Sequence, residues 1–573
     1  MTSSLLRWLD EPSSERGIYL SGDAGEWNFR SYAQIASAAR GVAEELAGRG
    51  VTPGSVVCIV LPTDHDSVAT FFGIWAAGAV ICPIAPPAMQ QAADYVSHVA
   101  AIVEHARPVA TISPEPLAGL ISAALARTHC AAAPWVISAR PGDARLRRPG
   151  EFALLQFTSG STARPCGIRV PWGSLDANIA AIRHWLRWQE GEGIASWLPF
   201  YHDMGLIGCL LTTVAAQGDM WLMRPDQFIR DPRRWLTALQ PGRGCRTSAP
   251  PFGYAYAAAR MASASLDGLD LSSVRSAVVG AECIDLPSLE RFASLLRSRG
   301  FAPEAFAPAY GLAEATLLVA GGSGGKAPTV LRPDWGSMAF GALVEITAYG
   351  LLGSVAEPGE TGWLVGCGGA CRGVGIAIAG SDGEPLPDGH LGEITVTGTS
   401  IASGYAADPG GRATRFDNGV LRTGDAGFIV NHELFVIGRM GDSLKIRGRT
   451  FFVETLESRL ASHTGLRRGR YAVVNTTADG RSGVALLAEV PAGDWVPKAG
   501  ALLGRELSAD CSITIITGKS GLIKRTSSGK PRRRHMWELI RSGTAVGTIV
   551  YRNDAAERDS ATMIPSSTMS RPR

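Results

Sequence analysis

Short apolar runs alternate with alanine-rich helical patterns in the first half of this chain, and this alternation constrains the fold more than any other feature. Residues 32–49 have the spacing of a helix, and residues 56–61 form a Val/Ile run. The alternation recurs between residues 192 and 320, where residues 206–216 are expected to be helical. Parallel strands joined by crossover helices have this pattern, so the sequence predicts two α/β layers, each with a largely parallel sheet.

The rest of the chain predicts a different organisation. After residue 365 the helical patterns fade, and runs such as 392–397 indicate the antiparallel strands of a distorted β subdomain. Residues 440–551 have an α+β pattern of their own, long enough for a small mobile domain. We therefore predict an α/β chain with a large lobe at 1–439, a small C-terminal domain at 440–551 and a disordered polar tail at 552–573.

Composition excludes several classes of protein. The 55 basic and 52 acidic residues nearly balance, which disfavours nucleic acid as a partner. Ten scattered cysteines show no zinc-binding spacing and are typical of reduced thiols in the cytoplasm, and the N-terminus lacks a secretory signal. The apolar stretch 68–87 is divided by Gly and Pro, so we interpret it as a buried helix and strand rather than an integral membrane segment.

A loop rich in hydroxyl groups follows one strand-like run, in Leu155-Gln-Phe-Thr-Ser-Gly-Ser-Thr162. Gly160 permits close approach of the backbone, and the neighbouring Ser and Thr residues add hydroxyl donors, as binding of a polyphosphate requires. The loop lacks the G-x-x-x-x-G-K-[ST] pattern of a Walker loop. Such clusters are also common in ordinary surface loops, so the other motifs of the chain decide its interpretation.

Further motifs follow in a fixed order. They are Ser196-Trp-Leu-Pro-Phe-Tyr-His-Asp-Met-Gly205, Tyr310-Gly-Leu-Ala-Glu-Ala-Thr316, Leu421-Arg-Thr-Gly-Asp425, Gly438-Arg439 and Lys524-Arg-Thr-Ser-Ser-Gly-Lys530. With the loop, this series resembles the adenylate-forming (acyl-activating) superfamily and is most similar to its fatty acyl-AMP ligase branch. The resemblance runs from about residue 29 to about residue 530 and implies an enzyme that uses ATP and Mg²⁺.

The resemblance also implies roles for individual residues. Thr158, Ser159, Gly160, Ser161 and Thr162 would hold the ATP phosphates. Tyr310, with Gly311, would stack on adenine, and Gly280, Ala281 and Glu282 would line the base, although Tyr310 alone equally fits a core aromatic. Asp425 would accept hydrogen bonds from both ribose hydroxyls, with Arg439 as a second contact.

Catalysis by such an enzyme requires that mutually repelling anions be brought together. By resemblance, Glu314 would bind magnesium, Lys530 would join the carboxylate to the α-phosphate, and Thr158 would complete the catalytic set. Pro531-Arg-Arg-Arg-His535 after Lys530 is expected to be part of a flexible basic loop. Cys166 stands where the family usually has a lysine, and Arg164 or Arg169 are the candidate substitutes.

The substrate implied by the resemblance is an apolar carboxylic acid. Its pocket is expected to include Trp197, His202, Met204, Phe252 and Tyr254, although each also fits core packing. His202 has no need to act as a base, because an ionised carboxylate attacks without one.

The long passage at 317–363 is where acyl-AMP ligases carry an extra segment, and it favours an acyl carrier protein over CoA as the acceptor. The acidic surface of such a carrier would meet Arg532-Arg-Arg534. Two alternatives stay open: an acyl-CoA ligase, and an inactive nucleotide-binding scaffold, for which Cys166 and Gly441 are the departures to consider. An amino-acid-activating domain is a weaker option, because no distinct acidic residue is marked for an α-ammonium group.

Overall fold

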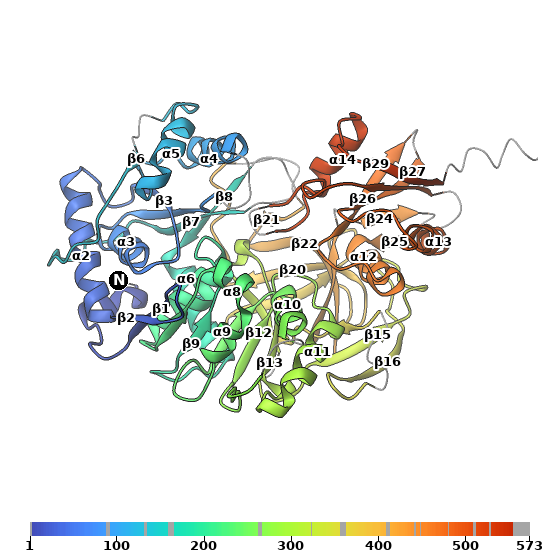
Figure 1. Cartoon of the computed structure of the whole chain (residues 1–573), viewed down its shortest axis with the longest axis horizontal. Coiled ribbons are helices and arrows are strands. Elements are labelled where there is room, and N and C mark those ends of the chain that lie inside the picture. The colour runs from blue at the N-terminus through green and yellow to red at the C-terminus, as the bar shows by residue number, and fades with distance from the viewer. Residues whose placement is uncertain are drawn as a thin grey trace, which may run out of the picture. The chain divides into compact units, whose positions relative to one another are not determined.

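The computed structural model describes residues 3–87, 92–130, 134–158, 165–261, 266–322, 324–355, 362–407, 413–440, 443–446, 449–478, 481–507, 511–526 and 529–553. Within these ranges, the side chains of residues 158, 444–446, 449–450, 455, 477–478 and 481–482 are not described. The chain forms two compact units, Met1–Val436 and Ile437–Arg573 (Figure 1). The division falls close to the end of the predicted large lobe.

The first sheet of the N-terminal unit has six strands in the order β6-β5-β3-β4-β7-β8, parallel except for the pair β7 and β8. Along β3, Val57 and Ile59 belong to the core that continues into the second sheet, whereas Cys58 and Val60 pack in a cluster with α4 and α5. Both faces are therefore covered, as is usual for parallel sheets. The elements are β3 (Val56–Val60), β4 (Val80–Ile84), β5 (Ala110–Ile112), β6 (Pro134–Trp135), β7 (Phe152–Thr158), β8 (Cys166–Pro171), α4 (Ala92–Ala106) and α5 (Ala118–Leu125).

Local signals in the sequence fix where the helices of this sheet begin. Ser31 and Gln34 form a reciprocal capping box at the start of α2 (Tyr32–Gly48). The Asp64 side chain accepts from the backbone N–H of Ser67 and caps α3 (His65–Ala76). Because α3 and β4 occupy most of the apolar stretch 68–87, its interpretation as a buried helix and strand is confirmed. Among the helices that the structure describes, none combines the length and apolar character needed to cross a membrane.

The second sheet has nine strands in the order β18-β14-β13-β12-β11-β9-β10-β1-β2, parallel from β13 to β1 and antiparallel at both ends. The strands are β1 (Gly17–Ser21), β2 (Trp27–Ser31), β9 (Ile194–Ser196), β10 (Met220–Leu222), β11 (Arg246–Ala249), β12 (Ser276–Val279), β13 (Phe306–Gly311), β14 (Leu318–Gly321) and β18 (Gly369–Ala370). The helices that flank or connect them are α6 (Trp172–Trp185), α8 (Pro225–Arg230), α9 (Pro232–Thr237), α10 (Pro251–Met261) and α11 (Leu286–Leu296).

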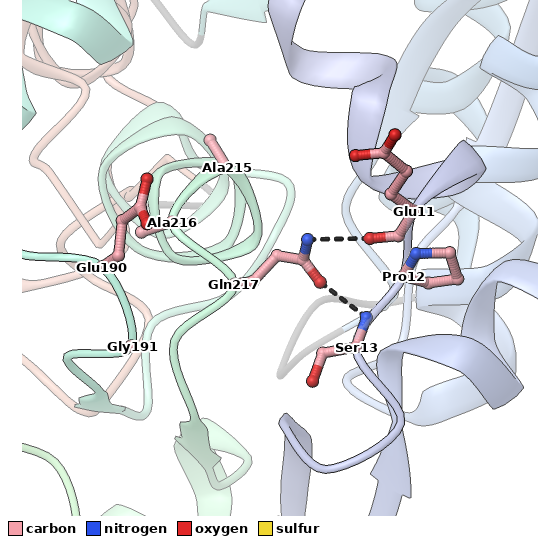
Figure 2. Close-up of a pocket in the computed structure, with 8 residues that line it drawn as sticks. All are labelled: Glu11, Pro12, Ser13, Glu190, Gly191, Ala215, Ala216 and Gln217. Atoms are coloured by element: carbon pink, nitrogen blue, oxygen red, sulfur yellow. Dashed lines mark hydrogen bonds between the residues drawn. The ribbon is translucent and has the colours of Figure 1, made fainter.

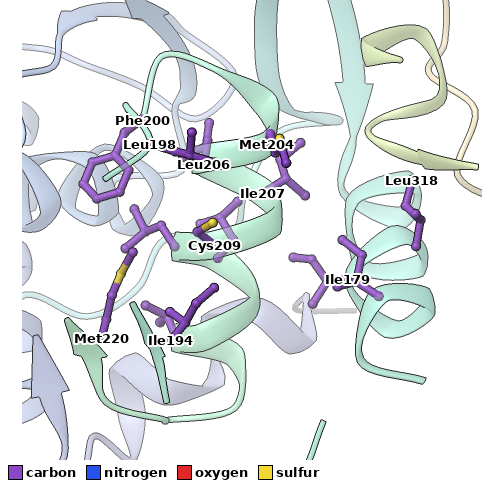
Figure 3. Close-up of a cluster of buried hydrophobic side chains, with 14 of the residues drawn as sticks. Ile179, Ile194, Leu198, Phe200, Met204, Leu206, Ile207, Cys209, Met220 and Leu318 are labelled. Carbon is purple, nitrogen blue, oxygen red and sulfur yellow. The ribbon is translucent and has the colours of Figure 1, made fainter. Parts of the chain in front are cut away.

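A π-helix, Met204–Leu211, connects β9 to the short α7 (Thr212–Ala215). The Thr212 hydroxyl donates to the carbonyl of Ile207, five residues earlier, at 2.7 Å. Figure 3 shows the apolar side chains of this helix between Ile194 and Met220 on one side and Ile179 of α6 on the other. Helical periodicity predicts this element but not its π winding, which the structure reveals. π-helical turns are frequent at functional sites.

The predicted β subdomain consists of two antiparallel sheets. One has three strands, β16-β15-β17, and the other has the order β19-β20-β22-β21, with β23 also paired to β22. Their strands are β15 (Thr329–Pro333), β16 (Ile346–Leu351), β17 (Leu364–Val365), β19 (Val374–Ala379), β20 (Gly392–Gly398), β21 (Arg415–Asp417), β22 (Val420–Val430) and β23 (Glu433–Arg439). The predicted α/β fold, with two largely parallel sheets and a β subdomain, is confirmed.

The C-terminal unit is built around a four-stranded sheet, β26-β27-β28-β29. Along β26, Tyr471 and Val473 pack in one apolar cluster with α12 and α13, whereas Ala472 and Val474 pack in another with Met536 of α14. The helices therefore lie on opposite faces of the sheet, as Figure 1 shows. The elements are β24 (Ser443–Ile446), β25 (Arg449–Phe452), α12 (Val453–Thr464), β26 (Tyr471–Ala478), β27 (Arg481–Ala488), α13 (Trp495–Leu507), β28 (Ser512–Thr517), α14 (Arg533–Arg541) and β29 (Thr548–Asn553).

Residue 552, where the polar tail was predicted to begin, lies within β29. β29 pairs with β28 as far as Asn553, so residues 552 and 553 belong to the sheet. Residues 554–573 lie outside the described part of the chain.

Candidate active site

A strand pair anchors the predicted phosphate loop at both ends. β7 ends at Thr158, which lies opposite Cys166 of β8. Of the expected phosphate contacts, the side chain of Thr158 and all of Ser159, Gly160, Ser161, Thr162 and Arg164 lie outside what the structure describes.

Arg169, on the strand after the loop, is the described candidate for the charge of the lysine in the family pattern. Cys166 is only 4% exposed. Arg169 donates from Nη2 to the carbonyl of Tyr405 at 2.7 Å, and its guanidinium lies over the ring of Phe152. Arg169 is therefore held along β8, where its charge also orders a neighbouring segment.

That segment, residues 400–406, runs along β8. The Arg169 N–H donates to the carbonyl of Gly404 and the Ser403 N–H donates to the carbonyl of Arg169, each at 2.9 Å. The Ala406 N–H donates to the carbonyl of Gly167 at 2.7 Å. Tyr405 is thus fixed next to the strand that leaves the phosphate loop.

Glu314 lies in a single 3-10 turn, Ala313–Ala315, and is 6% exposed. The hydroxyl of Tyr405 donates to its Oε1 at 2.8 Å, and the Ala402 N–H donates to its backbone carbonyl at 2.9 Å. The 400–406 segment therefore connects the strand after the loop to the predicted magnesium ligand. This arrangement brings together two motifs that are about 150 residues apart in the sequence.

A buried asparagine holds the chain on the other side of Glu314. Asn178 of α6 donates from Nδ2 to the carbonyls of Ala315 and Leu318 and accepts from the Leu318 N–H at 3.1 Å. Thr316, between these partners, has a left-handed φ of 70° and donates its hydroxyl to the carbonyl of Ser400 at 2.6 Å. The turn is thus fixed by side chains despite its strained backbone.

The two residues predicted to hold the nucleoside contact each other. The hydroxyl of Tyr310, at the end of β13, donates to Oδ2 of Asp425 on β22 at 2.7 Å. Both side chains are less than a tenth exposed. The Asp425 N–H donates to the hydroxyl of Thr423, which fixes the backbone that presents the carboxylate.

Gly280, Ala281 and Glu282 follow β12, which is parallel to β13. A side chain at Gly280 would lie 2.9 Å from the carbonyl of Ala309, so only glycine permits this close approach to the strand of Tyr310. Ala281 has a left-handed φ of 67°, and Glu282 is exposed. The predicted base-lining segment therefore lies beside Tyr310. On the other side of the tyrosine, a side chain at Gly311 would clash with the carbonyl of Leu317.

The five predicted acyl-pocket residues divide into two groups. Phe252 is 43% exposed and packs edge-on against Trp197, which is buried and stacked on Phe228. Met204 begins the π-helix, and His202 accepts the Leu206 N–H at its carbonyl. These four lie on segments that follow β9 and β11.

Tyr254 corresponds to the alternative of core packing. Its side chain is completely buried, its hydroxyl donates to the carbonyl of Val278, and its ring packs against Phe292 and Phe306. Burial raises the pKa of this phenol well above its usual range. A residue enclosed by the core offers no surface to a substrate.

The remaining predicted residues belong to the C-terminal unit. Arg439 ends β23 and is exposed. Lys530 is also exposed, in a tight turn in which the Thr526 N–H donates to the Lys530 carbonyl and the Lys530 N–H donates to the Thr526 hydroxyl. Residues 441–442, which include the expected departure Gly441, lie outside the described residues.

The expectation of one flexible basic loop after Lys530 is wrong. Residues 533–541 form α14, and Arg533 turns inward to pair with Glu457 at 3.0 Å and Glu454 at 3.3 Å. Burial beside two carboxylates favours this inward arrangement because the guanidinium is neutralised there. Arg534, by contrast, has a side chain that is 61% exposed.

A surface pocket of about 330 Å³ lies elsewhere in the N-terminal unit. Figure 2 shows Gln217 reaching toward the N-terminal segment, where it donates to the carbonyl of Glu11 and accepts from the Ser13 N–H. Its other lining residues are Pro12, Glu190, Gly191, Ala215 and Ala216. None of the predicted site residues lines it.

Comparison with known proteins decides the family. The model of the family described as AMP-binding enzyme matches residues 11–406. The chain belongs to this family of AMP-binding enzymes. The resemblance drawn from the motifs is thereby confirmed.

Relatives of this AMP-binding enzyme carry related names. The long-chain-fatty-acid–AMP ligase FadD26 of Mycobacterium tuberculosis is 31% identical over 490 residues, which is 81% of this chain and 82% of FadD26. The medium-chain-fatty-acid–[acyl-carrier-protein] ligase TtuA of Teredinibacter turnerae is 33% identical over 329 residues, 55% of this chain and 50% of TtuA. A structure from a study of fatty acyl-adenylate ligases of E. coli and L. pneumophila is 29% identical, with a TM-score of 0.83 over 95% of this chain and 98% of that one.

Two residues that organise the site of this AMP-binding enzyme were not predicted. Tyr405 and Asn178 hold the turn of Glu314 from opposite sides. The dipeptide Gly404-Tyr405 at the end of a strand-like region was the one available signal for Tyr405. Asn178 lies in a helical pattern and has no distinguishing neighbour.

Proposed function

We propose that this AMP-binding enzyme activates an apolar carboxylic acid with ATP, forming acyl-AMP and releasing pyrophosphate. The observation that carries the proposal is the hydrogen bond of 2.7 Å between Tyr310 and Asp425, next to the turn of Glu314. A buried tyrosine and carboxylate at the end of a parallel strand suit a nucleoside, because ligands of α/β sheets bind beyond the carboxyl ends of the strands.

In this proposal Asp425 accepts hydrogen bonds from the ribose hydroxyls. A carboxylate has about four lone-pair positions on two oxygens, so the bond from Tyr310 leaves acceptor capacity for a ligand. The ring of Tyr310 stacks on adenine, and Gly280, Ala281 and Glu282 line the base. Arg439 supplies a second contact to the ribose.

Thr158 and the loop that follows it would hold the β- and γ-phosphates. Glu314 fits a role as magnesium ligand because it is a hard oxygen donor fixed by Tyr405. The described residues contain no cluster of three or more His, Cys, Asp or Glu side chains arranged for a metal. This donor set suits Mg²⁺, which is usually held by one or two carboxylates together with substrate phosphates. When bound, the ion would neutralise charge on the phosphate oxygens.

Lys530 is the residue that we propose to act at the reacting atoms. Its ammonium would bridge the acid carboxylate and the α-phosphate, two anions that otherwise repel each other. A carboxylate oxygen then attacks the α-phosphorus, the bond from that phosphorus to the bridging oxygen breaks, and pyrophosphate leaves. No general base is required because the attacking carboxylate is already ionised.

The pocket for the acid would include Trp197, His202, Met204 and Phe252, whereas Tyr254 belongs to the core. An aromatic pair and the apolar π-helix favour a hydrocarbon chain. The names of FadD26 and of the fatty acyl-adenylate ligases support a fatty acid as the substrate.

The acceptor that we propose is an acyl carrier protein, in line with the name of TtuA. A second candidate activity is completion of a CoA thioester, since both acceptors present the same phosphopantetheine thiol. We also place the enzyme in the cytoplasm. All ten cysteines are free thiols, including Cys58 and Cys82, which lie directly opposite each other on β3 and β4.

Trapping with hydroxylamine tests the proposal. Wild-type protein with ATP, Mg²⁺ and a panel of fatty acids should produce acyl hydroxamates and pyrophosphate, and Asp425→Asn should reduce the rate at least about tenfold through weaker ATP binding. Repeating the reaction with CoA and with a phosphopantetheinylated carrier separates the two acceptors. ATP binding without hydroxamate from any acid would instead identify an inactive nucleotide-binding scaffold.

A further inference from the structure

Basic charge is concentrated in one part of the C-terminal unit. Residues 511–553 contain nine Lys and Arg residues and a single acidic residue, Glu538, whereas the whole chain has a net charge of only +3. This excess of positive charge produces an electrostatic field of one sign, which steers partners of the opposite sign toward the unit.

Most of these cations point outward. The Arg534 side chain is 61% exposed, and Arg541 is exposed and lies over the ring of Trp537. Lys519 and Lys524 are exposed in the segment before the Lys530 turn. Arg533 and Arg525 are exceptions, because Arg533 pairs with Glu454 and Glu457 and Arg525 pairs with Glu489.

Backbone hydrogen bonds connect the segments that carry these outward cations. The Arg532 N–H donates to the carbonyl of Lys524 at 2.7 Å, which joins the Lys519–Lys524 segment to the start of α14. The Ala545 N–H donates to the carbonyl of Leu539, which places the next loop at the other end of the helix. In that loop Val546 is 87% exposed. We call the surface formed by Lys519, Lys524, Arg534, Arg541 and Val546 the α14 face.

We propose that the α14 face is the docking surface for the acidic carrier protein that receives the acyl group. The inference rests on the proposed function and names the surface of the enzyme that its acceptor contacts. Dispersed cations around an exposed valine complement a protein surface that presents carboxylates around an apolar contact.

A membrane is the less suitable partner for this surface. The apolar residues of α14, Met536, Trp537 and Ile540, pack against the sheet in a cluster with Leu522 and Ile523. These apolar residues of the helix therefore turn toward the sheet, which leaves little apolar helix surface for insertion between lipids.

The chain provides a matched pair of variants. R534E/R541E reverses two charges on the α14 face, and R505E reverses a similarly exposed cation (69%) on α13, which packs on the opposite face of the sheet. Neither variant alters Lys530. We expect the double variant to lower kcat/KM for the phosphopantetheinylated carrier about tenfold, with unchanged hydroxamate formation, and R505E to leave both rates unchanged.

Three further measurements keep the result interpretable. The double variant places a carboxylate at position 534, four residues before Glu538, so thermal melting should be recorded. R534Q/R541Q, which adds no like-charge pair, should lower transfer about threefold. Added salt should slow transfer by the wild type more than transfer by the double variant.

The outcomes separate the inference from the proposed function. Absence of hydroxamate from the wild type would overturn the function and the docking surface with it. Hydroxamate formation combined with equal transfer by wild type and double variant would overturn the docking surface alone. An equal loss of carrier transfer in R505E would also overturn the docking surface. The same holds if the double variant no longer binds anionic vesicles of phosphatidylcholine and phosphatidylserine but transfers to the carrier at an unchanged rate.

Discussion

At the scale of single residues, Tyr405 connects two functions of the candidate site. Its backbone lies along β8, the strand after the phosphate loop, while its hydroxyl holds Oε1 of Glu314 at 2.8 Å. A carboxylate that is already held in one orientation loses less conformational entropy when it binds a cation. Tyr405 is therefore a positioning residue for Glu314.

We predict that Tyr405→Phe raises the Mg²⁺ concentration for half-maximal hydroxamate formation about five- to tenfold, because the variant loses about 1 kcal/mol of hydrogen bonding at Glu314. Tyr32→Phe is the control, since that buried hydroxyl donates to the carbonyl of Gly218. Both variants should lose similar stability, but only the first should shift the Mg²⁺ titration. An unshifted titration would leave Tyr405 with a structural role only.

Asn178 gives a prediction about stability. Asn178→Ala would leave the carbonyls of Ala315 and Leu318 and the Leu318 N–H without this partner in a buried region. We expect a loss of about 3 kcal/mol in the free energy of unfolding, measured by urea denaturation. Asn178→Asp should also destabilise the protein, because a carboxylate cannot donate to the two carbonyls. A change below about 1 kcal/mol in both variants would contradict this account.

Tyr310 and Asp425 were singled out because each is part of a distinctive motif, and the structure brings their side chains into contact. Asn178 was not predictable. Its partners are backbone groups, which are the same for every residue type and leave no mark in the sequence. Tyr254 shows the opposite problem, since an aromatic residue after a strand fits a pocket wall and a core equally well.

At the scale of elements, periodicity in the sequence identified strands and helices but did not distinguish an α-helix from a π-helix. Residues 206–216 were predicted to be helical, and most of them form a π-helix. A nearly continuous apolar run packs in either winding, so periodicity does not distinguish the two. α14 is a second difference, since part of the predicted basic loop is a helix in which Arg533 pairs with two carboxylates.

Glu290 of α11 provides a prediction at this scale. It is 7% exposed, burial raises the pKa of its carboxyl, and it accepts a hydrogen bond from the N–H of Gly353, just after β16. Near and below the ordinary pKa of about 4.3, both folded and unfolded states bind the proton. As the pH rises above that value, the unfolded state ionises first, so the folded state loses stability until the raised pKa is passed.

Glu290→Gln should remove this loss because the amide does not ionise and its oxygen still accepts from Gly353. The melting temperature of the variant minus that of the wild type should therefore increase between pH 4 and pH 7. Glu304→Gln is the control, because Glu304 is also acidic but is exposed. A difference that is constant with pH would contradict the assignment.

At the scale of the whole molecule, the candidate residues are divided between two units. Tyr310, Glu314 and Asp425 belong to Met1–Val436, and Lys530 belongs to Ile437–Arg573. Sequence patterns indicated this division near its observed place because the α/β alternation ends before the small α+β region. The order of strands was less accessible, since β1 and β2 at the N-terminus join the second sheet rather than the first.

We predict that Lys530→Ala lowers the rate of acyl-AMP formation at least about a hundredfold while ATP affinity changes less than about threefold. The reason is that its ammonium is proposed to act at the reacting atoms, away from the base and ribose. Lys498→Ala, on α13, is the control and should retain full activity. Calorimetric titration with ATP and hydroxamate trapping measure the two quantities, and equal loss of both would reassign Lys530 to nucleotide binding.

The pairing of residues 400–406 with β8 makes the surroundings of Glu314 sensitive to chain length. Neighbours in an extended segment point to opposite sides. Deletion of one residue between Ser400 and Gly404 would bring Ala406 to the place of the phenol, and insertion of one would bring Gly404 there. Neither residue has a hydroxyl to offer the carboxylate. Indels in this stretch should therefore be far less tolerated than substitutions, and engineered chimeras should exchange it together with β8 and the 313–315 turn as one cassette.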